Sequence, residues 1–198
     1  MSKRVLLLCC AFVSAVMASA LQAKGFMPSD VQRLQTVSDP VFHPDGLSLI
    51  YSVGEVDTAK DEEVSDLWSV ALNGSAPIRL TKTPSNESQP SLSPDGGTLY
   101  FLSDAGKDNV SQIWTMPAAG GKAKVLSQFP QGVEDYVLSP DGKSIAVIVR
   151  DADTDALKPA PIHPKPLVTT RFQFKEDVTG YLDDKRLHLH LVSTKDGN

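Results

Sequence analysis

Two histidines near the end of the chain come nearest, by type and spacing, to a metal site. His188 and His190 alternate along a predicted strand, so their side chains point to the same face. They could supply two metal ligands, but a zinc site needs three or four and no third ligand is evident. The sequence therefore favours the other interpretation, two partly exposed strand residues, and predicts no metal-binding residue.

Motifs for covalent or phosphate chemistry do not occur in the sequence. The chain has no Gly-x-Ser-x-Gly nucleophile elbow, no Gly-x-x-x-x-Gly-Lys loop, no His-Glu-x-x-His helix and no Gly-x-Gly-x-x-Gly turn. Serine, aspartate and histidine all occur, but their presence alone does not define a triad. We therefore predict no catalytic residue, no cofactor-binding residue and no cofactor.

A Pro-Asp-Gly phrase occurs three times, each time before a strand-length run of apolar residues. Its aspartates are Asp45, Asp95 and Asp141, which gives repeat periods of 50 and 46 residues. Proline presets φ at the first corner of a tight turn, aspartate bonds nearby backbone, and glycine accepts the positive φ that closes the turn. Internal periods of this size predict a propeller or a solenoid.

Each repeat has a second half with two more predicted strands. Trp68 and Trp114 each stand six residues before a hairpin-turn glycine, Gly74 or Gly120, and a strand pattern follows each turn. Four short strands make a propeller blade, so the predicted fold is all-β: an incomplete β-propeller of about three blades of four-stranded antiparallel sheet. We expect both tryptophans to pack between adjacent blades.

The predicted domains follow from this repeat. They are a signal peptide at 1–23 and a partial propeller at 24–198, with blade 1 at about 37–82, blade 2 at about 86–128 and blade 3 at about 133–198. In blade 3, Leu191 stands six residues before Gly197 in the place of the tryptophans, which implies an insertion at 151–186. Three blades, the last unfinished, cannot close a ring, so we expect the N-terminal part of a longer protein.

The insertion opens with three aspartates, continues through four prolines and then becomes aromatic and mixed in charge. Proline favours stiff, extended conformations. Long insertions that keep aromatics and arginines are often binding or docking elements, but a solvated loop folded back on its blade has the same composition. The sequence leaves both interpretations open. A shorter acidic stretch at 57–66 is predicted to be a solvated surface loop.

The first 23 residues have the features of a secretory signal peptide. Lys3 and Arg4 precede an apolar stretch that is short for a membrane anchor, and small residues allow cleavage after Ala20 or Ala23. A transmembrane anchor is the less favoured alternative. Cleavage removes both cysteines, so the mature chain has no disulfide and no thiolate metal site. We expect a periplasmic or secreted protein whose first element is a short helix at 28–35.

Charge limits the partners of the chain. The sequence has 19 basic and 24 acidic residues, a net charge of −5, and the chain without residues 1–23 has 17 and 24, or −7. Because the basic residues form no run, we expect neither nucleic acid nor, after signal cleavage, a membrane as a partner. The composition, 41% hydrophobic and 22% charged, is typical of a soluble globular protein.

The Pro-Asp-Gly repeats resemble those in the β-propellers of TolB and of the prolyl oligopeptidase family of serine peptidases. A more specific likeness lies at 169–177, 180–182 and 186–189, which resemble the inserted segment of the acylaminoacyl-peptidase and dipeptidyl-peptidase-like branch. The stretches 27–31 and 37–40 also resemble that branch's entry into its first blade.

This resemblance implies the N-terminal propeller of an exported serine peptidase that hydrolyses short peptides. In that family the propeller caps a C-terminal α/β-hydrolase domain and restricts access to its Ser-Asp-His triad. The resemblance transfers no catalytic residue, because no position here matches the triad motifs, and we expect this chain alone to be inactive. It implies a peptide substrate and the hydrolase domain as partners, with the insertion after Arg150 as the candidate docking element.

Two other interpretations stay open. One is a non-enzymatic periplasmic propeller of the TolB type that acts as a protein-binding scaffold, and the other is a truncated product that never folds stably. Sequence beyond residue 198 separates a scaffold from a peptidase, because a peptidase continues into a Gly-x-Ser-x-Gly motif followed by aspartate and histidine.

Overall fold

The computed structural model describes residues 25–106, 109–152, 168–169, 172–177, 180–182 and 185–197. The chain divides into two units, residues 1–34 and 35–198. In the first unit, the predicted short helix is the 3-10 helix η1 (Pro28–Arg33), where Asp30 accepts a 2.8 Å hydrogen bond from the Met27 N–H. The predicted signal peptide and its alternative, a membrane anchor, lie outside the described residues.

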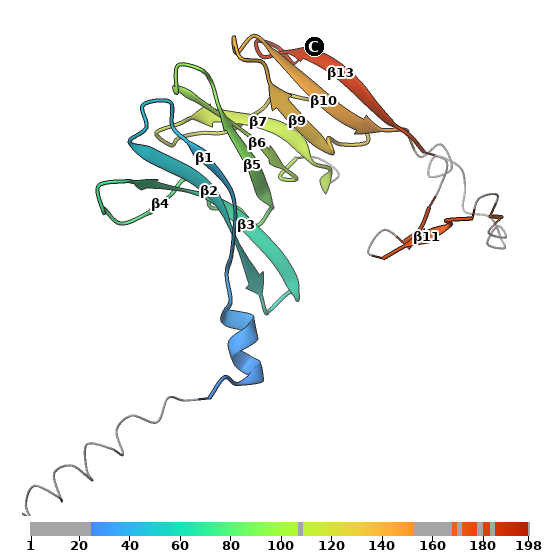
Figure 1. The fold of residues 1–198 in the computed structure, drawn as a ribbon, viewed down its shortest axis with the longest axis horizontal. Helices are drawn as coiled ribbons and strands as arrows, with labels where there is room; N and C mark the ends of the chain where they lie inside the picture. The colour runs from blue at the N-terminus through green and yellow to red at the C-terminus, as the bar shows by residue number, and fades with distance from the viewer. Residues whose placement is uncertain are drawn as a thin grey trace, which may run out of the picture. The chain divides into compact units, whose positions relative to one another are not determined.

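Successive antiparallel sheets make up the second unit (Figure 1). The first sheet has the order β1 (Thr36–Phe42), β2 (Ser48–Asp57), β3 (Glu62–Ala71), β4 (Ile78–Arg79). The second has the order β5 (Glu87–Leu92), β6 (Thr98–Ser103), β7 (Gln112–Pro117), β8 (Lys124–Val125). The third has the order β13 (Leu187–Ser193), β10 (Ser144–Arg150), β9 (Asp135–Leu138). The predicted all-β incomplete propeller is confirmed, with three rather than four described strands in the third sheet.

The Pro-Asp-Gly turns connect the first two strands of each sheet. The carboxylates of Asp45, Asp95 and Asp141 accept hydrogen bonds of 2.8–3.1 Å from the backbone N–H two residues further on. The glycine after each aspartate has a positive φ of 68–73°. This is the predicted turn chemistry, and it starts the second strand of each sheet in the same register.

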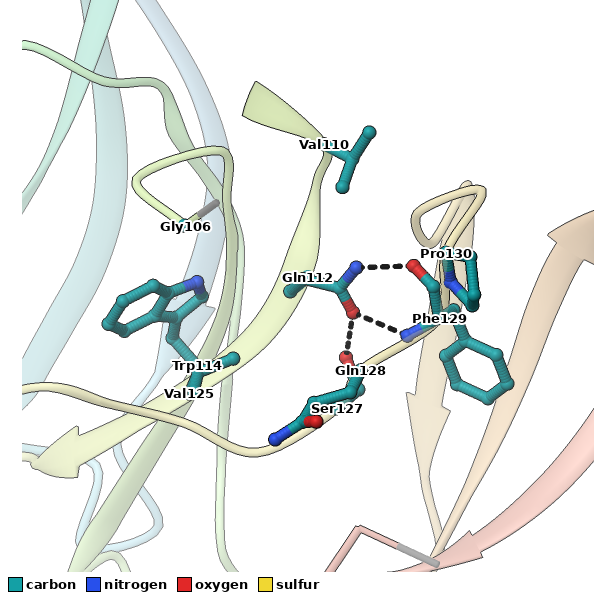
Figure 2. A pocket seen from close by; sticks show the side chains of 9 residues that line it. All are labelled: Gly106, Val110, Gln112, Trp114, Val125, Ser127, Gln128, Phe129 and Pro130. Carbon is teal, nitrogen blue, oxygen red and sulfur yellow. Dashed lines mark hydrogen bonds between the residues drawn. The ribbon is translucent and has the colours of Figure 1, made fainter. Parts of the chain in front are cut away.

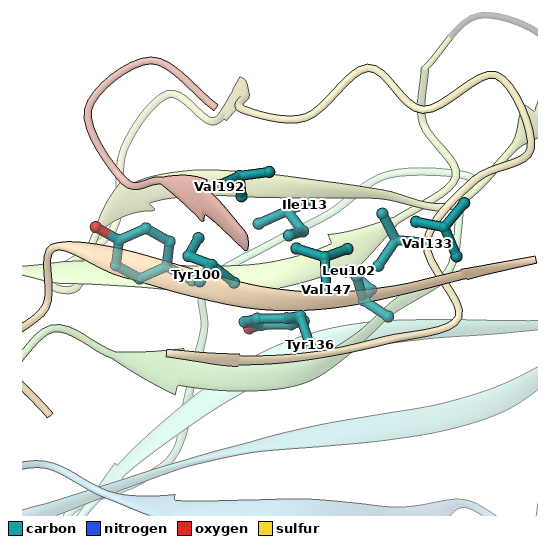
Figure 3. Close-up of a cluster of buried hydrophobic side chains, with 9 residues drawn as sticks. Tyr100, Leu102, Ile113, Val133, Tyr136, Val147 and Val192 are labelled. Carbon is teal, nitrogen blue, oxygen red and sulfur yellow. The ribbon is translucent and has the colours of Figure 1, made fainter. Parts of the chain in front are cut away.

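Two apolar clusters join the three sheets. The cluster between the first and second sheets contains Ile50, Leu67, Leu99, Phe101 and Met116. The cluster between the second and third sheets contains Tyr100, Leu102, Ile113, Val133, Tyr136, Ile145, Val147, Val149 and Val192 (Figure 3). Alternation along β6 sends Leu99 and Phe101 to one cluster and Tyr100 and Leu102 to the other. Each fully buried side chain of this size contributes about 1.5–3 kcal/mol, so the second sheet is held on both faces.

The two tryptophans have equivalent positions but different surroundings. Trp114 packs against the cluster between the first two sheets, as predicted. Trp68 is half-buried and lies 5.9 Å from the Arg79 guanidinium, a cation–π distance. Its neighbour Leu67 points into that cluster, so Trp68 points to the opposite face of the first sheet, which no other blade covers among the described residues.

Strand register corrects the predicted equivalence in the third blade. Phe101 and Val147 each stand six residues after a turn aspartate, and their cross-strand partners are Trp114 and His190. His190 therefore occupies the tryptophan position, and Leu191 points to the opposite face. The sequence-based count placed Leu191 there because it assumed six residues between this position and the turn glycine. In the third blade the separation, from His190 to Gly197, is seven residues.

The acidic stretch at 57–66 is solvated over residues 58–63, as predicted, but it is the end of a β-hairpin rather than a loop. β2 continues to Asp57 and β3 begins at Glu62, so only a tight turn separates two long strands. Asp66 is 2% exposed, and its carboxylate accepts hydrogen bonds from Arg79 and from the Thr81 hydroxyl. The charge pattern did not predict the burial of Asp66, because the partners that compensate its charge are 13 and 15 residues away.

Candidate functional site

The first strands of the three sheets line a shared groove of about 350 Å³. β1, β5 and β9 contribute to it, and its polar residues are Asp39, Gln89, Ser91, Asp135 and Tyr136. These strands come from segments about 50 residues apart, so only the blade repeat brings them together. We take this inner-strand groove as the candidate functional site.

A bulge interrupts the pairing of each of the first two groove strands. The register shifts between Ser38 and Val41 in β1 and between Ser88 and Ser91 in β5. The bulged residues are Asp39 and Gln89, each followed by proline, and they have φ values of 51° and 50°. Left-handed backbone costs a non-glycine residue about 1–2 kcal/mol, so these positions need support from their surroundings.

Hydrogen bonds between blades provide that support. The Asp39 carboxylate accepts 3.3 Å hydrogen bonds from the Gln89 N–H and from the Ser52 hydroxyl. The Tyr136 hydroxyl donates to the Gln89 carbonyl at 2.7 Å. Burial raises the pKa of the Tyr136 hydroxyl far above its ordinary value, and the Asp135 charge acts in the same direction. The phenol therefore stays a neutral donor, and the groove wall is fixed across all three blades.

Removal of the Tyr136 hydroxyl tests this support. Tyr136→Phe is expected to lower the free energy of unfolding by about 1–2 kcal/mol, because it leaves the Gln89 carbonyl without its partner. Urea unfolding followed by tryptophan fluorescence measures the loss. Tyr51→Phe, at a half-buried position in β2, is the control, and an equal loss in both variants would show that the bond contributes nothing.

A second pocket, of about 340 Å³, lies beside the connection from the second to the third sheet (Figure 2). The Gln112 amide donates to the Phe129 carbonyl at 2.6 Å and accepts from the Phe129 N–H at 3.0 Å and the Ser127 hydroxyl at 2.8 Å. Ser127 in turn accepts from the Ile113 N–H at 2.8 Å. The Gln112 side chain thus bonds the backbone of this connection as a neighbouring strand would. Its polar atoms are used within the fold and not to bind a ligand.

The first sheet has the same clamp with different residues. The Leu67 N–H donates to the Thr81 hydroxyl at 2.9 Å, and that hydroxyl donates to the Asp66 carboxylate at 3.1 Å. Asp66 and Gln112 therefore have equivalent roles, each directly before an aliphatic residue and a tryptophan. Sequence reasoning missed this pair, although a threonine or serine 14 residues after the aliphatic residue was a usable signal.

The two histidines of β13 have separate partners. His188 Nε2 lies 2.6 Å from the Asp151 carboxylate, and the His190 ring lies 5.3 Å from that of Phe129. Asp151 also accepts from the Arg186 N–H at 2.9 Å, a bond that lowers the pKa of its carboxyl. Within the described ranges, no group of three or more His, Cys, Asp or Glu side chains is placed to hold a metal ion.

Asp151 and Arg186 also close the base of the predicted insertion, because the Asp151 N–H donates to the Arg186 carbonyl at 2.9 Å. The described part of the insertion contains the antiparallel pair β11 (Lys175–Glu176) and β12 (Gly180–Tyr181). The Phe172 side chain is fully exposed and that of Phe174 is 45% exposed. The prediction that the insertion docks on another domain stays a prediction. No helix in the described part of the chain is long and apolar enough to cross a membrane.

The repeated sheets and the shared inner-strand groove define an open part of a β-propeller. The chain belongs to the TolB beta propeller domain family, whose model matches residues 27–163.

Curated relatives match a shorter region. The chain is 32% identical over 75 residues to the uncharacterized peptidase YuxL of Bacillus subtilis, a match that covers 38% of this chain and 11% of that protein. It is 33% identical over 79 residues to dipeptidyl-peptidase 5 of Porphyromonas gingivalis, which covers 40% of this chain and 12% of that protein. The matched region is thus a small part of either peptidase.

Solved structures share the fold. An acylaminoacyl peptidase of Pyrococcus horikoshii aligns with 85% of this chain and 24% of its own, with a TM-score of 0.64 and 14% identity. A putative TolB of Agrobacterium tumefaciens aligns with 79% of this chain and 45% of its own, with a TM-score of 0.52 and 22% identity.

Proposed function

We propose that these blades are the N-terminal propeller of an exported serine peptidase that hydrolyses short peptides. In this proposal the propeller gates access to an α/β-hydrolase domain and docks on it. The observation that carries the proposal is the pair of matches at 32% and 33% identity to proteins named as peptidases. Because those matches span 11% and 12% of the relatives, the hydrolase domain, the substrate and the activity of the whole protein all belong to the proposal.

The inner-strand groove is the part of this chain that we assign to gating. Its backbone is held at Gln89, whose N–H donates to the Asp39 carboxylate and whose carbonyl accepts from the Tyr136 hydroxyl, so we treat the groove as a rigid wall. A rigid wall selects substrates by size, because a short peptide fits past it and a folded protein does not. We assign docking to the insertion, whose exposed Phe172 and Phe174 offer apolar contact area.

Two measurements test the peptidase proposal. The gene sequence beyond codon 198 is expected to encode a Gly-x-Ser-x-Gly motif followed by aspartate and histidine. The full-length product is then expected to hydrolyse aminoacyl or dipeptidyl chromogenic substrates, with the loss of that activity on replacement of the motif serine by alanine. A reading frame without this motif, or hydrolysis that survives the replacement, would contradict the proposal.

Export is a separate part of the proposal and has its own measurement. After expression in a Gram-negative host, the mass of the mature protein is expected to match a chain that begins at Leu21 or at Lys24. These starts correspond to cleavage after Ala20 or after Ala23. Recovery of an intact N-terminus in the cytoplasm would argue against a signal peptide.

The alternative is a TolB-like periplasmic scaffold that binds proteins and has no activity. The family match over residues 27–163 favours it as much as it favours a peptidase, because the blade repeat carries no reaction. A stop codon soon after ring closure would support the scaffold.

A further inference from the structure

A buried carboxyl group lies at the junction between the first two sheets. Glu87 opens β5, and only 1% of its surface is exposed. The Ser65 hydroxyl of β3 donates to the Glu87 carbonyl at 2.9 Å, and the neighbouring Asn86 forms a bridge with Ser65. The position of this carboxyl group is therefore set by both sheets.

The two carboxyl oxygens of Glu87 have unequal surroundings. Oε1 accepts hydrogen bonds from the hydroxyls of Thr83 at 2.7 Å and Ser103 at 2.9 Å. Oε2 is buried and has no hydrogen-bond partner. A buried ionised oxygen without a partner costs far more than a neutral one, because a charge loses more hydration free energy.

The charged groups on the surrounding elements do not compensate a negative Glu87. Asp66 on β3 is itself acidic, and the Arg79 guanidinium on β4 pairs with Asp66 and lies 4.0 Å from Glu55. Beyond β6, Asp104 accepts hydrogen bonds from Asn86, and on β1, Asp39 accepts from the Gln89 N–H. Lys82, in the connection from β4 to β5, is exposed. No cation in the described part of the chain forms an ion pair with Glu87.

We propose that the folded chain holds Glu87 as a neutral carboxylic acid, and that ionisation of this group loosens the junction between the first two sheets. Burial, the largest cause, raises the pKa of Glu87 above its ordinary value of 4.5, and the Asp66 charge acts in the same direction. The hydroxyls of Thr83, Ser103 and Thr81 lower the pKa and offset part of this rise, although the Thr81 hydroxyl donates its hydrogen bond to Asp66 rather than to Glu87.

The direction of the pH effect follows from proton binding. Between pH 4.5 and the raised pKa, the folded chain keeps a proton that the unfolded chain has lost. The contribution of Glu87 to stability is therefore fully present below pH 4.5 and is lost as the pH rises through the raised pKa. β5 also carries Gln89, two residues away, so ionisation acts on the strand that lines the groove.

Thermal unfolding of the full chain between about pH 5 and about pH 8 tests the proposal. The midpoint of thermal unfolding of the wild type is expected to fall with pH relative to that of Glu87→Gln, by about 3–5 °C for each factor of ten by which folding weakens the acid. Glu62→Gln, the same change on an exposed residue of β3, is the control and is expected to follow the wild type. Amide hydrogen exchange in β3 and β5, compared at one pH, is expected to be faster in the wild type than in Glu87→Gln at about pH 8.

A second measurement decides the case in which Glu87→Gln does not fold. The carboxyl carbon signal of Glu87 in wild-type protein labelled with carbon-13 is expected to titrate with a midpoint above 4.5, the ordinary pKa of this group. Unfolding midpoints that change in parallel with pH for the wild type and Glu87→Gln would overturn the proposal, and so would a Glu87 carbon signal that titrates with a midpoint at or below 4.5.

Discussion

Gly142→Ala is expected to lower the free energy of unfolding by about 3 kcal/mol, and Gly46→Ala by only about 1 kcal/mol. Both glycines follow the aspartate of a Pro-Asp-Gly turn, with φ values of +68° and +70°, so alanine meets the same backbone strain at each. The surroundings differ, because a Cβ at Gly142 would lie 2.7 Å from the Pro94 ring of the preceding blade. At Gly46 no described atom lies within 4 Å of that position.

The difference between these variants isolates the contact between successive turns. Gly96→Ala is expected to fall between them, since its Cβ would lie 2.6 Å from the His43 ring, which can rotate away. That rotation gives up the 3.1 Å hydrogen bond between His43 Nε2 and the Gly96 carbonyl. Urea unfolding measures all three losses, provided that the dependence of the unfolding free energy on urea concentration is unchanged. Equal losses at Gly46 and Gly142 would mean that the turns do not pack on one another.

Gln112→Ala is expected to destabilise the chain by about 2–4 kcal/mol. The substitution leaves the Phe129 N–H and carbonyl and the Ser127 hydroxyl without the partners at 2.6–3.0 Å that the amide provides. The Ser127 hydroxyl is then left buried without this partner, and the backbone of the partly buried Phe129 has to find new ones. Urea unfolding measures the loss, and hydrogen exchange at residues 127–133 is expected to accelerate more than exchange in β2.

Gln128→Ala is the matched control for this clamp. Gln128 lines the same pocket but is exposed, so its removal is expected to change stability by less than about 0.5 kcal/mol. Gln112→Glu adds a sharper comparison, because its second oxygen would face the Phe129 carbonyl in place of a donor. A Gln112→Ala variant as stable as Gln128→Ala would show that the connection holds without the clamp.

The turn repeat made the fold predictable because its signals are local. Proline, aspartate and glycine act within four residues, and the structure has those turns at Asp45, Asp95 and Asp141. Strand alternation is equally local, which is why the four-stranded sheets were predictable. Predictions that needed a partner from elsewhere in the chain did less well. In the acidic stretch at 57–66, the exposure of residues 58–63 was predicted but the burial of Asp66 was not, because no residue near Asp66 in the sequence indicates its partners Arg79 and Thr81.

The groove and the two clamps could not be predicted from the sequence for the same reason. Asp39, Gln89 and Tyr136 are 50 and 47 residues apart, and nothing in their types alone marks them as hydrogen-bond partners. By itself the amino-acid sequence determined a repeating blade, its turns and the absence of any nucleophile motif, since these depend on neighbouring residues. Only the tertiary structure decided which side chains meet between blades, that Glu87 is buried with one unpartnered oxygen, and that His190 replaces a tryptophan. Those outcomes depend on the register and packing of strands far apart in the chain, which short-range patterns do not specify.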